Sequence, residues 1–135
     1  MTFTIDTTLP EQIFYINRQM LKAYAEASGD FNPIHLDEEF AKSVGLPNVI
    51  AHGMLTMALA GEAVRRWMAD GYSEYSIVDF TTRFTKPVIV PADTEVAINF
   101  GGKVLEVGET DISLEVSAIS NGVKVLGQTK VRLAL

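Results

Sequence analysis

The chain has 135 residues, carries a formal net charge of −6 and contains no cysteine. Its length predicts one domain, residues 1–135, that is large enough to bury a core without disulfides. The lack of cysteine excludes disulfides, thiolate zinc sites and cysteine nucleophiles. The acidic balance argues against nucleic-acid binding, which needs basic patches. Because no signal peptide and no membrane-spanning apolar run is recognisable, a cytoplasmic protein without membrane contact is expected.

Two short helices are expected in the first third of the chain. The first follows Asn17, a residue suited to the N-cap position, and runs to about Ser28. The second spans about Glu38 to Val44, with Asp37 as its cap and Gly45 as its end.

A longer helix is expected from about Gly53 to Met68. Apolar or small residues fill nearly all of its first ten positions, which leaves almost no polar face. A helix that is apolar all round is normally buried all round. Charged residues appear only in its second half, so that end is expected to reach solvent.

After Gly71 the apolar period changes to two, which is typical of strands with one covered face. The alternating runs are 77–84, 95–100, 111–118 and 123–133. Asn121-Gly122 indicates a type I′ hairpin turn before the last run. Among the expected helices, only 53–68 is long enough to cover the apolar face of the sheet. The sequence therefore predicts an α+β domain in which an antiparallel sheet wraps around a buried helix.

Residues 28–37 read S-G-D-F-N-P-I-H-L-D and place an acid near a histidine in a loop. Pro33 disfavours helical geometry at Asn32, so Asp30 and His35 lie in a turned segment where they can converge. A carboxylate and an imidazole at one site can share a water and exchange its protons. Asn32 is expected to hold the loop through side-chain-to-backbone bonds. From the spacing alone, a plain turn before a capped helix is the more common interpretation.

The second candidate is I-A-H-G-M, residues 50–54. Gly53 opens the long helix, where unpaired N–H groups and the positive dipole end suit an oxyanion such as a thioester enolate. Glycine there lets a carbonyl approach closely, but it also suits a tight joint. His52 is either a polar group of the site or a structural histidine bonded to backbone. With two histidines and no cysteine, a metal site is not expected, and nucleotide-binding and serine-hydrolase motifs are absent.

The run Y-A-E-A-S-G-D-F-N-P-I-H-L-D, followed by A-H-G-M-L-T-M, resembles the MaoC-like hydratase/dehydratase family. The resemblance implies the hot-dog fold, in which an antiparallel sheet wraps a long central helix. It implies that Asp30 and His35 are the catalytic pair and that the Gly53 N–H polarises the thioester carbonyl. Gly61 stands where some short-chain hydratases of the family have a serine. With that glycine, the chain looks most like the B subunit of the mycobacterial-type 3-hydroxyacyl-carrier-protein dehydratase.

The resemblance further implies a hydro-lyase of fatty-acid metabolism, acting reversibly on enoyl or (R)-3-hydroxyacyl thioesters of coenzyme A or acyl carrier protein. No metal or redox cofactor is expected, and the partner is a second hot-dog subunit, identical or similar. Substrate contacts are expected from Asn32, His52, Met54, Met57 and Gly61. Two alternatives stay open: a hot-dog acyl-thioesterase, which directs water at C1 instead of C3, and a non-catalytic acyl-binding subunit.

Overall fold

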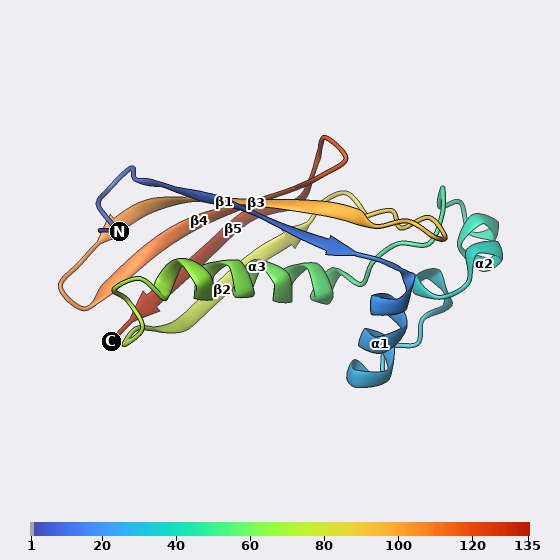
Figure 1. The fold of residues 1–135 in the computed structure, drawn as a ribbon, viewed down its shortest axis with the longest axis horizontal. Helices are drawn as coiled ribbons and strands as arrows, with labels where there is room; N and C mark the ends of the chain where they lie inside the picture. Colours follow the sequence, from blue (N-terminus) through green and yellow to red (C-terminus); the bar gives the residue numbers. More distant parts are fainter. Residues whose placement is uncertain (1) are drawn as a thin grey trace.

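The computed structural model describes residues 2–135, in which a five-stranded antiparallel sheet curls over one long helix (Figure 1). The strand order is β1-β3-β4-β5-β2. The strands are β1 (Thr8–Ile16), β2 (Ser76–Phe84), β3 (Val96–Val107), β4 (Asp111–Ser120) and β5 (Val123–Ala134). The helices are α1 (Arg18–Ser28), α2 (Glu38–Ser43) and α3 (Gly53–Met68), with a 3-10 turn η1 at Pro33–His35. The predicted α+β class and the sheet around a central helix are confirmed.

The helix ends follow the capping residues that the sequence indicates. The Asn17 side chain accepts a hydrogen bond from the N–H of Met20 at 2.9 Å, and the Asp37 side chain accepts one from Phe40 at 3.1 Å. Each bond satisfies an N–H that the first helical turn leaves without a partner. None of the helices within residues 2–135 is both long and apolar enough to cross a membrane.

The hairpin between β4 and β5 has the expected turn, whereas β3 is longer than its alternation indicates. Asn121 and Gly122 both have positive φ angles, of 50° and 76°, as a type I′ turn requires. β3 continues beyond residue 100 to Val107, although Gly101 and Gly102 interrupt the apolar pattern. A Cβ at Gly102 would lie 2.8 Å from the Trp67 ring, so the glycine makes room for α3 to pack on the strand.

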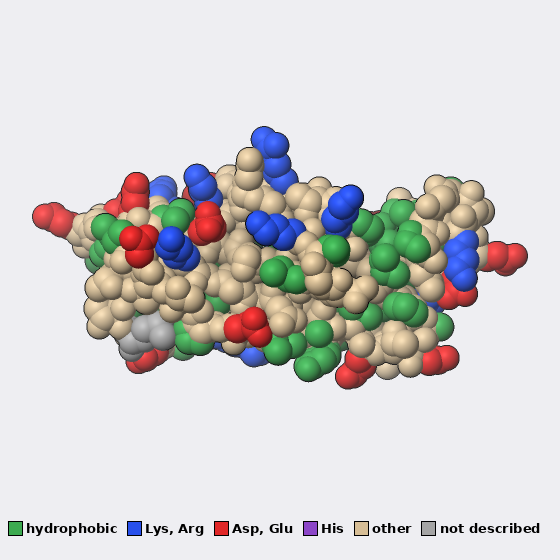
Figure 2. All heavy atoms as spheres, turned by 90° about the horizontal axis from the view of Figure 1, so that it is seen from above, with side chains coloured by type: hydrophobic (Ala, Val, Ile, Leu, Met, Phe, Trp, Pro, Cys, Tyr) green, Lys and Arg blue, Asp and Glu red, His purple; other side chains and the backbone are tan. Residues whose placement is uncertain are grey.

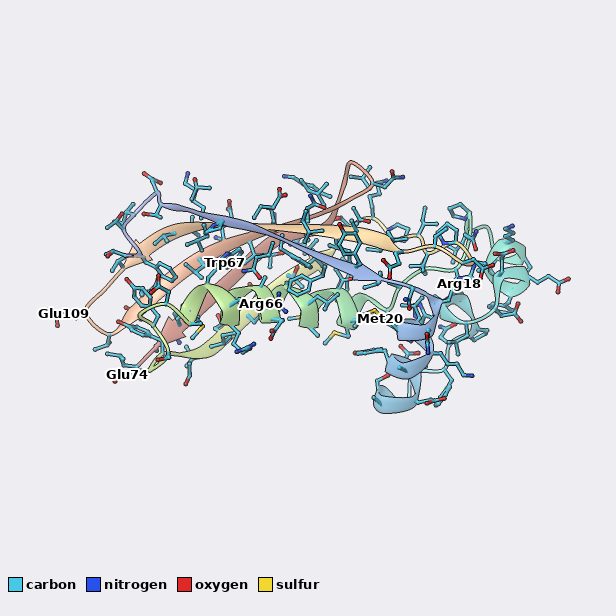
Figure 3. All side chains as sticks on the ribbon, in the orientation of Figure 1. Arg18, Met20, Arg66, Trp67, Glu74 and Glu109 are labelled. Carbon is cyan, nitrogen blue, oxygen red and sulfur yellow. The ribbon has the colours of Figure 1, made fainter. Side chains whose placement is uncertain are left out.

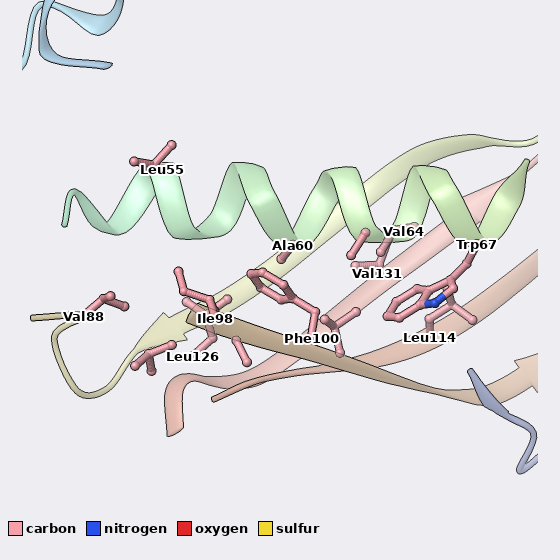
Figure 4. Close-up of a cluster of buried hydrophobic side chains, with 14 of the residues drawn as sticks. Leu55, Ala60, Val64, Trp67, Val88, Ile98, Phe100, Leu114, Leu126 and Val131 are labelled. Carbon is pink, nitrogen blue, oxygen red and sulfur yellow. The ribbon is translucent and has the colours of Figure 1, made fainter. Parts of the chain in front are cut away.

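The core lies between α3 and the inner face of the sheet. Ala60, Val64 and Trp67 of α3 are buried against sheet residues that include Phe100 and Leu114 (Figure 4). The Trp67 indole N–H also donates to the Pro10 carbonyl in β1, at 2.8 Å. Because aromatic and aliphatic side chains fill this space, the helix is fixed along the whole length of the sheet.

The prediction that α3 is buried all round was wrong for the single chain. One sheet covers only one side of a helix, and the opposite side carries Met54, which is 55% exposed, and the exposed Ala58. The outer face of the sheet is also open to solvent. Figure 2 shows that face, with Lys and Arg side chains spread over it and hydrophobic side chains gathered toward the end that bears α1 and α2. No histidine is visible there.

Candidate functional site

Arg18 ties the start of α1 to segments that follow the loop of the acid and the histidine. Its Nε donates to the Val90 carbonyl at 2.6 Å, and its Nη2 donates to Glu38 at 2.9 Å and to Asn48 at 2.7 Å. Arg18 begins α1, which precedes the loop (Figure 3). Glu38 begins α2, which follows the loop. A guanidinium presents several donors in a rigid fork, so one side chain can hold three segments together.

Within the loop, Asp30 and Asn32 turn the backbone through short-range bonds. Asp30 Oδ1 accepts from the Asn32 N–H at 3.1 Å, and Asn32 Oδ1 accepts from the Ile34 N–H at 3.2 Å. Such bonds are characteristic of Asx turns. The expected holding role of Asn32 is therefore confirmed, and the second carboxylate oxygen of the exposed Asp30 side chain lies free of this turn.

One ring nitrogen of His35 has no hydrogen-bond partner among residues 2–135. Its Nδ1 lies 2.7 Å from the Ile50 carbonyl oxygen. Because a carbonyl only accepts, Nδ1 carries the proton and Nε2 keeps its lone pair. Burial lowers the pKa of His35 below its ordinary value, and the charge of His52 acts in the same direction, while the bond to Ile50 and the charge of Asp30 oppose this shift. A neutral imidazole with a free Nε2 is a proton acceptor.

His52 lies behind His35 and is only 1% exposed. The two rings stack, with centroids 3.9 Å apart and planes 27° apart, and Tyr24 packs on His52 with ring centroids 4.8 Å apart. The Nε2–H of His52 donates to the Asp30 carbonyl at 3.0 Å. Its Nδ1 is buried without a hydrogen-bond partner among residues 2–135. The interpretation of His52 as a histidine bonded to backbone is confirmed.

Asp30, His35 and His52 each offer one potential ligand atom, and these atoms lie within 4.8 Å of one another. An acid with two histidines is a common metal-ligand set. Here, however, one nitrogen of each ring is bonded to a backbone carbonyl, and the two rings stack with centroids 3.9 Å apart. The arrangement suits proton exchange with a small molecule near Asp30 and His35 better than convergent metal ligation.

Gly53 shares a pocket of about 360 Å³ with His35. The other lining residues are Leu46, Ile50, Ala51, Thr56, Phe84, Thr85, Lys86, Pro87, Val88 and Val125. A Cβ at Gly53 would lie 3.1 Å from the Phe84 ring, so the glycine lets this ring pack close to the start of α3. The N–H groups of Leu55 and Thr56 bond to the His52 carbonyl, whereas the Gly53 N–H precedes the first intrahelical bond.

His35 also lines a second pocket, of about 490 Å³, on the side of α1. Its other lining residues are Arg18, Gln19, Lys22, Ala25, Glu26, Phe31 and Leu36. The His35 imidazole therefore lines two pockets.

The structure brings together Asp30, His35 and His52, and it places Gly53 in the same pocket as His35. None of the residues expected to contact substrate lines that pocket. Asn32 lies in the loop, His52 is buried beside it, and Met54, Met57 and Gly61 lie along α3. Their substrate contacts stay a prediction.

Sequence reasoning missed several residues of the pocket wall, including Thr56, Phe84 and Val125. Thr56 lies one helical turn after Gly53, so helical periodicity could have found it. Phe84 and Val125 come from β2 and β5, and no local motif marks them. They reach the pocket only because the sheet folds over the start of α3.

Comparison with known proteins gives a family and several relatives. Residues 3–122 match the family described as "MaoC like domain". The chain is 37% identical over 83 residues to "3-hydroxyacyl-thioester dehydratase X" of Mycobacterium tuberculosis, which covers 62% of this chain and 28% of that protein. The chain spans 2% to 28% of the length of the first curated relatives that it matches.

Solved structures show the same fold. A "MaoC-like dehydratase" superposes with a TM-score of 0.90 at 35% identity, over 98% of this chain and 40% of that one. The "ChsH1-ChsH2 complex" from Mycobacterium tuberculosis gives a TM-score of 0.84 at 20% identity, over 99% of both chains. The predicted hot-dog fold is confirmed, and the chain belongs to the MaoC-like dehydratase family.

Proposed function

We propose that this domain is a hydro-lyase that adds water reversibly across the C2=C3 bond of enoyl thioesters and gives (R)-3-hydroxyacyl thioesters. The observation that carries the proposal is the pairing of Asp30 with a buried His35 whose Nε2 is free, beside the Gly53 backbone in one pocket. Membership of the MaoC-like family supports the same reaction class. The thioester is carried by coenzyme A or acyl carrier protein, and the pathway is fatty-acid metabolism.

The hydration step uses Asp30 and His35 as one acid–base unit. A water held between the carboxylate and Nε2 of His35 gives up a proton to this pair while its oxygen bonds to C3. The electrons of the double bond move toward the thioester, and an enolate forms. The pair then returns a proton to C2, so that one water has been added and the protein is unchanged. The reverse sequence removes water from the 3-hydroxyacyl thioester.

Gly53 supports the charge that this step creates. The enolate places negative charge on the thioester oxygen, and the Gly53 N–H lies at the positive end of α3 without an intrahelical acceptor. A fixed donor aimed at a developing oxyanion typically contributes about 10²- to 10³-fold in rate.

A purified-protein assay with crotonyl thioesters of both carriers tests the proposal. We expect loss of the absorbance of the conjugated double bond without release of free thiol. Release of thiol at a matching rate would instead indicate a thioesterase. Binding of the acyl thioester without either change would indicate a non-catalytic acyl-binding subunit.

We also infer that the domain works in a pair of hot-dog subunits, either two copies or this chain with a similar partner. β2 is an edge strand whose Val78 and Phe84 are 49% and 54% exposed. The uncovered side of α3 adjoins it, since Gly61 faces the Phe80 ring. An exposed apolar surface of this kind is typical of a protein interface. One structural neighbour is itself a complex of two differently named subunits.

A further inference from the structure

We propose that His52 is a positioning residue that joins the Asp30 backbone, the His35 ring and the first turn of α3 into one unit. The proposal rests on the function proposed above. His52 touches neither pocket and is almost fully buried, so its effect passes through its neighbours. Each of its two contacts acts on a different member of the acid–base pair.

The first contact fixes the position of Asp30. The Asp30 carboxylate is exposed, and it accepts a hydrogen bond from the Asn32 N–H within the same loop. The Asp30 carbonyl, in contrast, accepts the His52 Nε2–H at 3.0 Å. His52 directly precedes Gly53, so this bond ties the acid to the start of α3, where the Gly53 N–H lies. This bond therefore helps to set the distance between the acid and the oxyanion donor, beside the bonds that join Ile50 to Ile34 and His35.

The second contact covers one face of His35. The rings lie 3.9 Å apart, and Tyr24 supports His52 from another direction. An imidazole held between aromatic rings excludes water from that face of His35 and fixes its plane. The Ile50 carbonyl then fixes rotation within that plane through Nδ1. Together these contacts hold Nε2 of His35 in one direction.

The unpartnered Nδ1 of His52 makes the two contacts separable. Nε2 carries the proton, so Nδ1 presents a lone pair, and no group among residues 2–135 bonds to it. A substitute needs to reproduce only one donor. His52→Gln offers an amide N–H for the Asp30 carbonyl but has no ring to stack. His52→Phe offers a flat ring for His35 but no donor.

The experiment compares these two variants with the wild type, all without a histidine tag. NMR titration of the imidazole signals gives the pKa of His35, and steady-state hydration of crotonyl thioesters gives kcat and KM. The chain has only two histidines, so either substitution leaves the His35 imidazole as the single histidine signal. The other charged or titratable groups around His35 are unchanged in both variants: Asp30, Arg18, Lys22, Glu26 and Lys86.

Opposite effects are expected from the two variants. In His52→Gln the pKa of His35 rises toward its ordinary value, because the ring that helps to bury His35 is gone, and the acid limb of kcat/KM moves with it. In His52→Phe the ring still covers His35, so this pKa stays lower than in His52→Gln. His52→Phe instead loses about 10²-fold in kcat with little change in KM, the scale for misplacing a reacting group by about 1 Å. His52→Gln retains most of the wild-type kcat.

Ser120→Ala serves as the matched control, and melting temperatures are recorded for all variants. Ser120 is buried and donates to the Ala97 carbonyl at 2.9 Å, but it lies at the end of β4, outside both pockets of His35. Loss of this hydrogen bond should lower the melting temperature without changing the pKa of His35 or kcat. His52→Leu, which also lacks a donor, is measured in case the phenyl ring prevents folding.

The proposal would be overturned if His52→Gln and His52→Phe lost equal amounts of kcat and the pKa of His35 in both variants stayed at its wild-type value. His52→Leu replaces His52→Phe in this comparison if the phenyl ring prevents folding. A wild type that hydrates no enoyl thioester would overturn the proposed function alone, since the NMR comparison needs no turnover. In that case, a pKa of His35 that is higher in His52→Gln than in His52→Phe still supports the coupling of the two rings. A pKa that is lower in His52→Gln than in His52→Phe contradicts it.

Discussion

The Nδ1 of His35 lies 2.7 Å from the carbonyl oxygen of Ile50, and this contact selects the ring nitrogen that is free for chemistry. The carbonyl itself is held firmly. Ala51 donates to Val88 at 2.9 Å, and Val90 donates to Val49 at 2.8 Å, so the segment that precedes α3 is paired with the segment that precedes β3. A fixed acceptor gives His35 one tautomer and one orientation.

The acid–base pair should be indispensable for hydration. We expect Asp30→Asn and His35→Ala each to lower kcat by at least about 10²-fold, the usual scale for loss of a general acid–base group. The measurement is steady-state hydration of crotonyl thioester, with circular dichroism to check the fold. Hydration at the wild-type rate in either folded variant would remove that residue from the chemistry.

The pH dependence should follow the lowered pKa of His35. Burial is the main cause, and the ordinary value is 6.5. Since the neutral ring accepts the proton, kcat/KM should stay level through neutral pH and fall only as the pH drops below 6.5. The unfolded chain binds this proton more readily than the folded chain, so stability should also decrease as the pH falls from 6.5 through the lowered pKa.

Thermal melts of the wild type and of His35→Gln across this range check the second effect. The variant lacks the titrating ring and should lose less stability on acidification. An acid limb of kcat/KM centred above 6.5 would contradict the expected direction of the shift.

Gly53→Ala should separate packing from chemistry. The new Cβ would lie 3.1 Å from the Phe84 ring, so the ring must move, and we expect a loss of about 1 kcal/mol in the free energy of unfolding, at the low end of overpacking costs. Phe84→Leu in the same chain should restore stability. If the Gly53 backbone receives the thioester oxygen, kcat should stay low in the double variant. Recovery of both together would mean that Gly53 serves packing alone.

Assembly should depend on the exposed apolar surface of β2 and α3. Val78 and Val123 are exposed to similar extents, 49% and 45%, but Val123 lies in the β4–β5 hairpin. We expect Val78→Glu to shift sedimentation toward the monomer, because a charge in an apolar interface is costly, and Val123→Glu to leave it unchanged. A wild type that is monomeric at micromolar concentration yet fully active would count against the proposed pair of subunits.

Chain-length preference should report where the acyl group lies. Thr56 lines the pocket of His35, whereas Gly61 lies farther along α3 against Phe80. If the acyl tail fills the pocket, Thr56→Leu should shift preference toward four-carbon enoyl thioesters. If the acyl tail instead continues along α3, Gly61→Leu should cause this shift. Kinetics over a chain-length series decide, with melting temperatures recorded because overpacking costs about 1–3 kcal/mol. A stable variant with an unchanged profile removes its position from the acyl path.

Local sequence determined the elements and their ends. Asn17 and Asp37 cap the helices that they were expected to cap, and Asn121-Gly122 forms the expected turn. The loop from Asp30 to His35 could also be located, because Pro33 and Asn32 act on neighbouring backbone. These features depend on short-range sterics and hydrogen bonds, which a few consecutive residues encode completely.

Tertiary structure decided what those elements do together. The sequence alone left His52 either in the site or outside it; the stacking on His35 and the bond to Asp30 exist only once α3 is placed against the loop. Phe84 reaches Gly53 because β2 passes over the start of α3. The uncovered side of α3, which composition alone predicted to be buried, is open because a single sheet shields one side of a helix. Burial and long-range contacts depend on how distant segments pack, and neither is encoded in any local window of the chain.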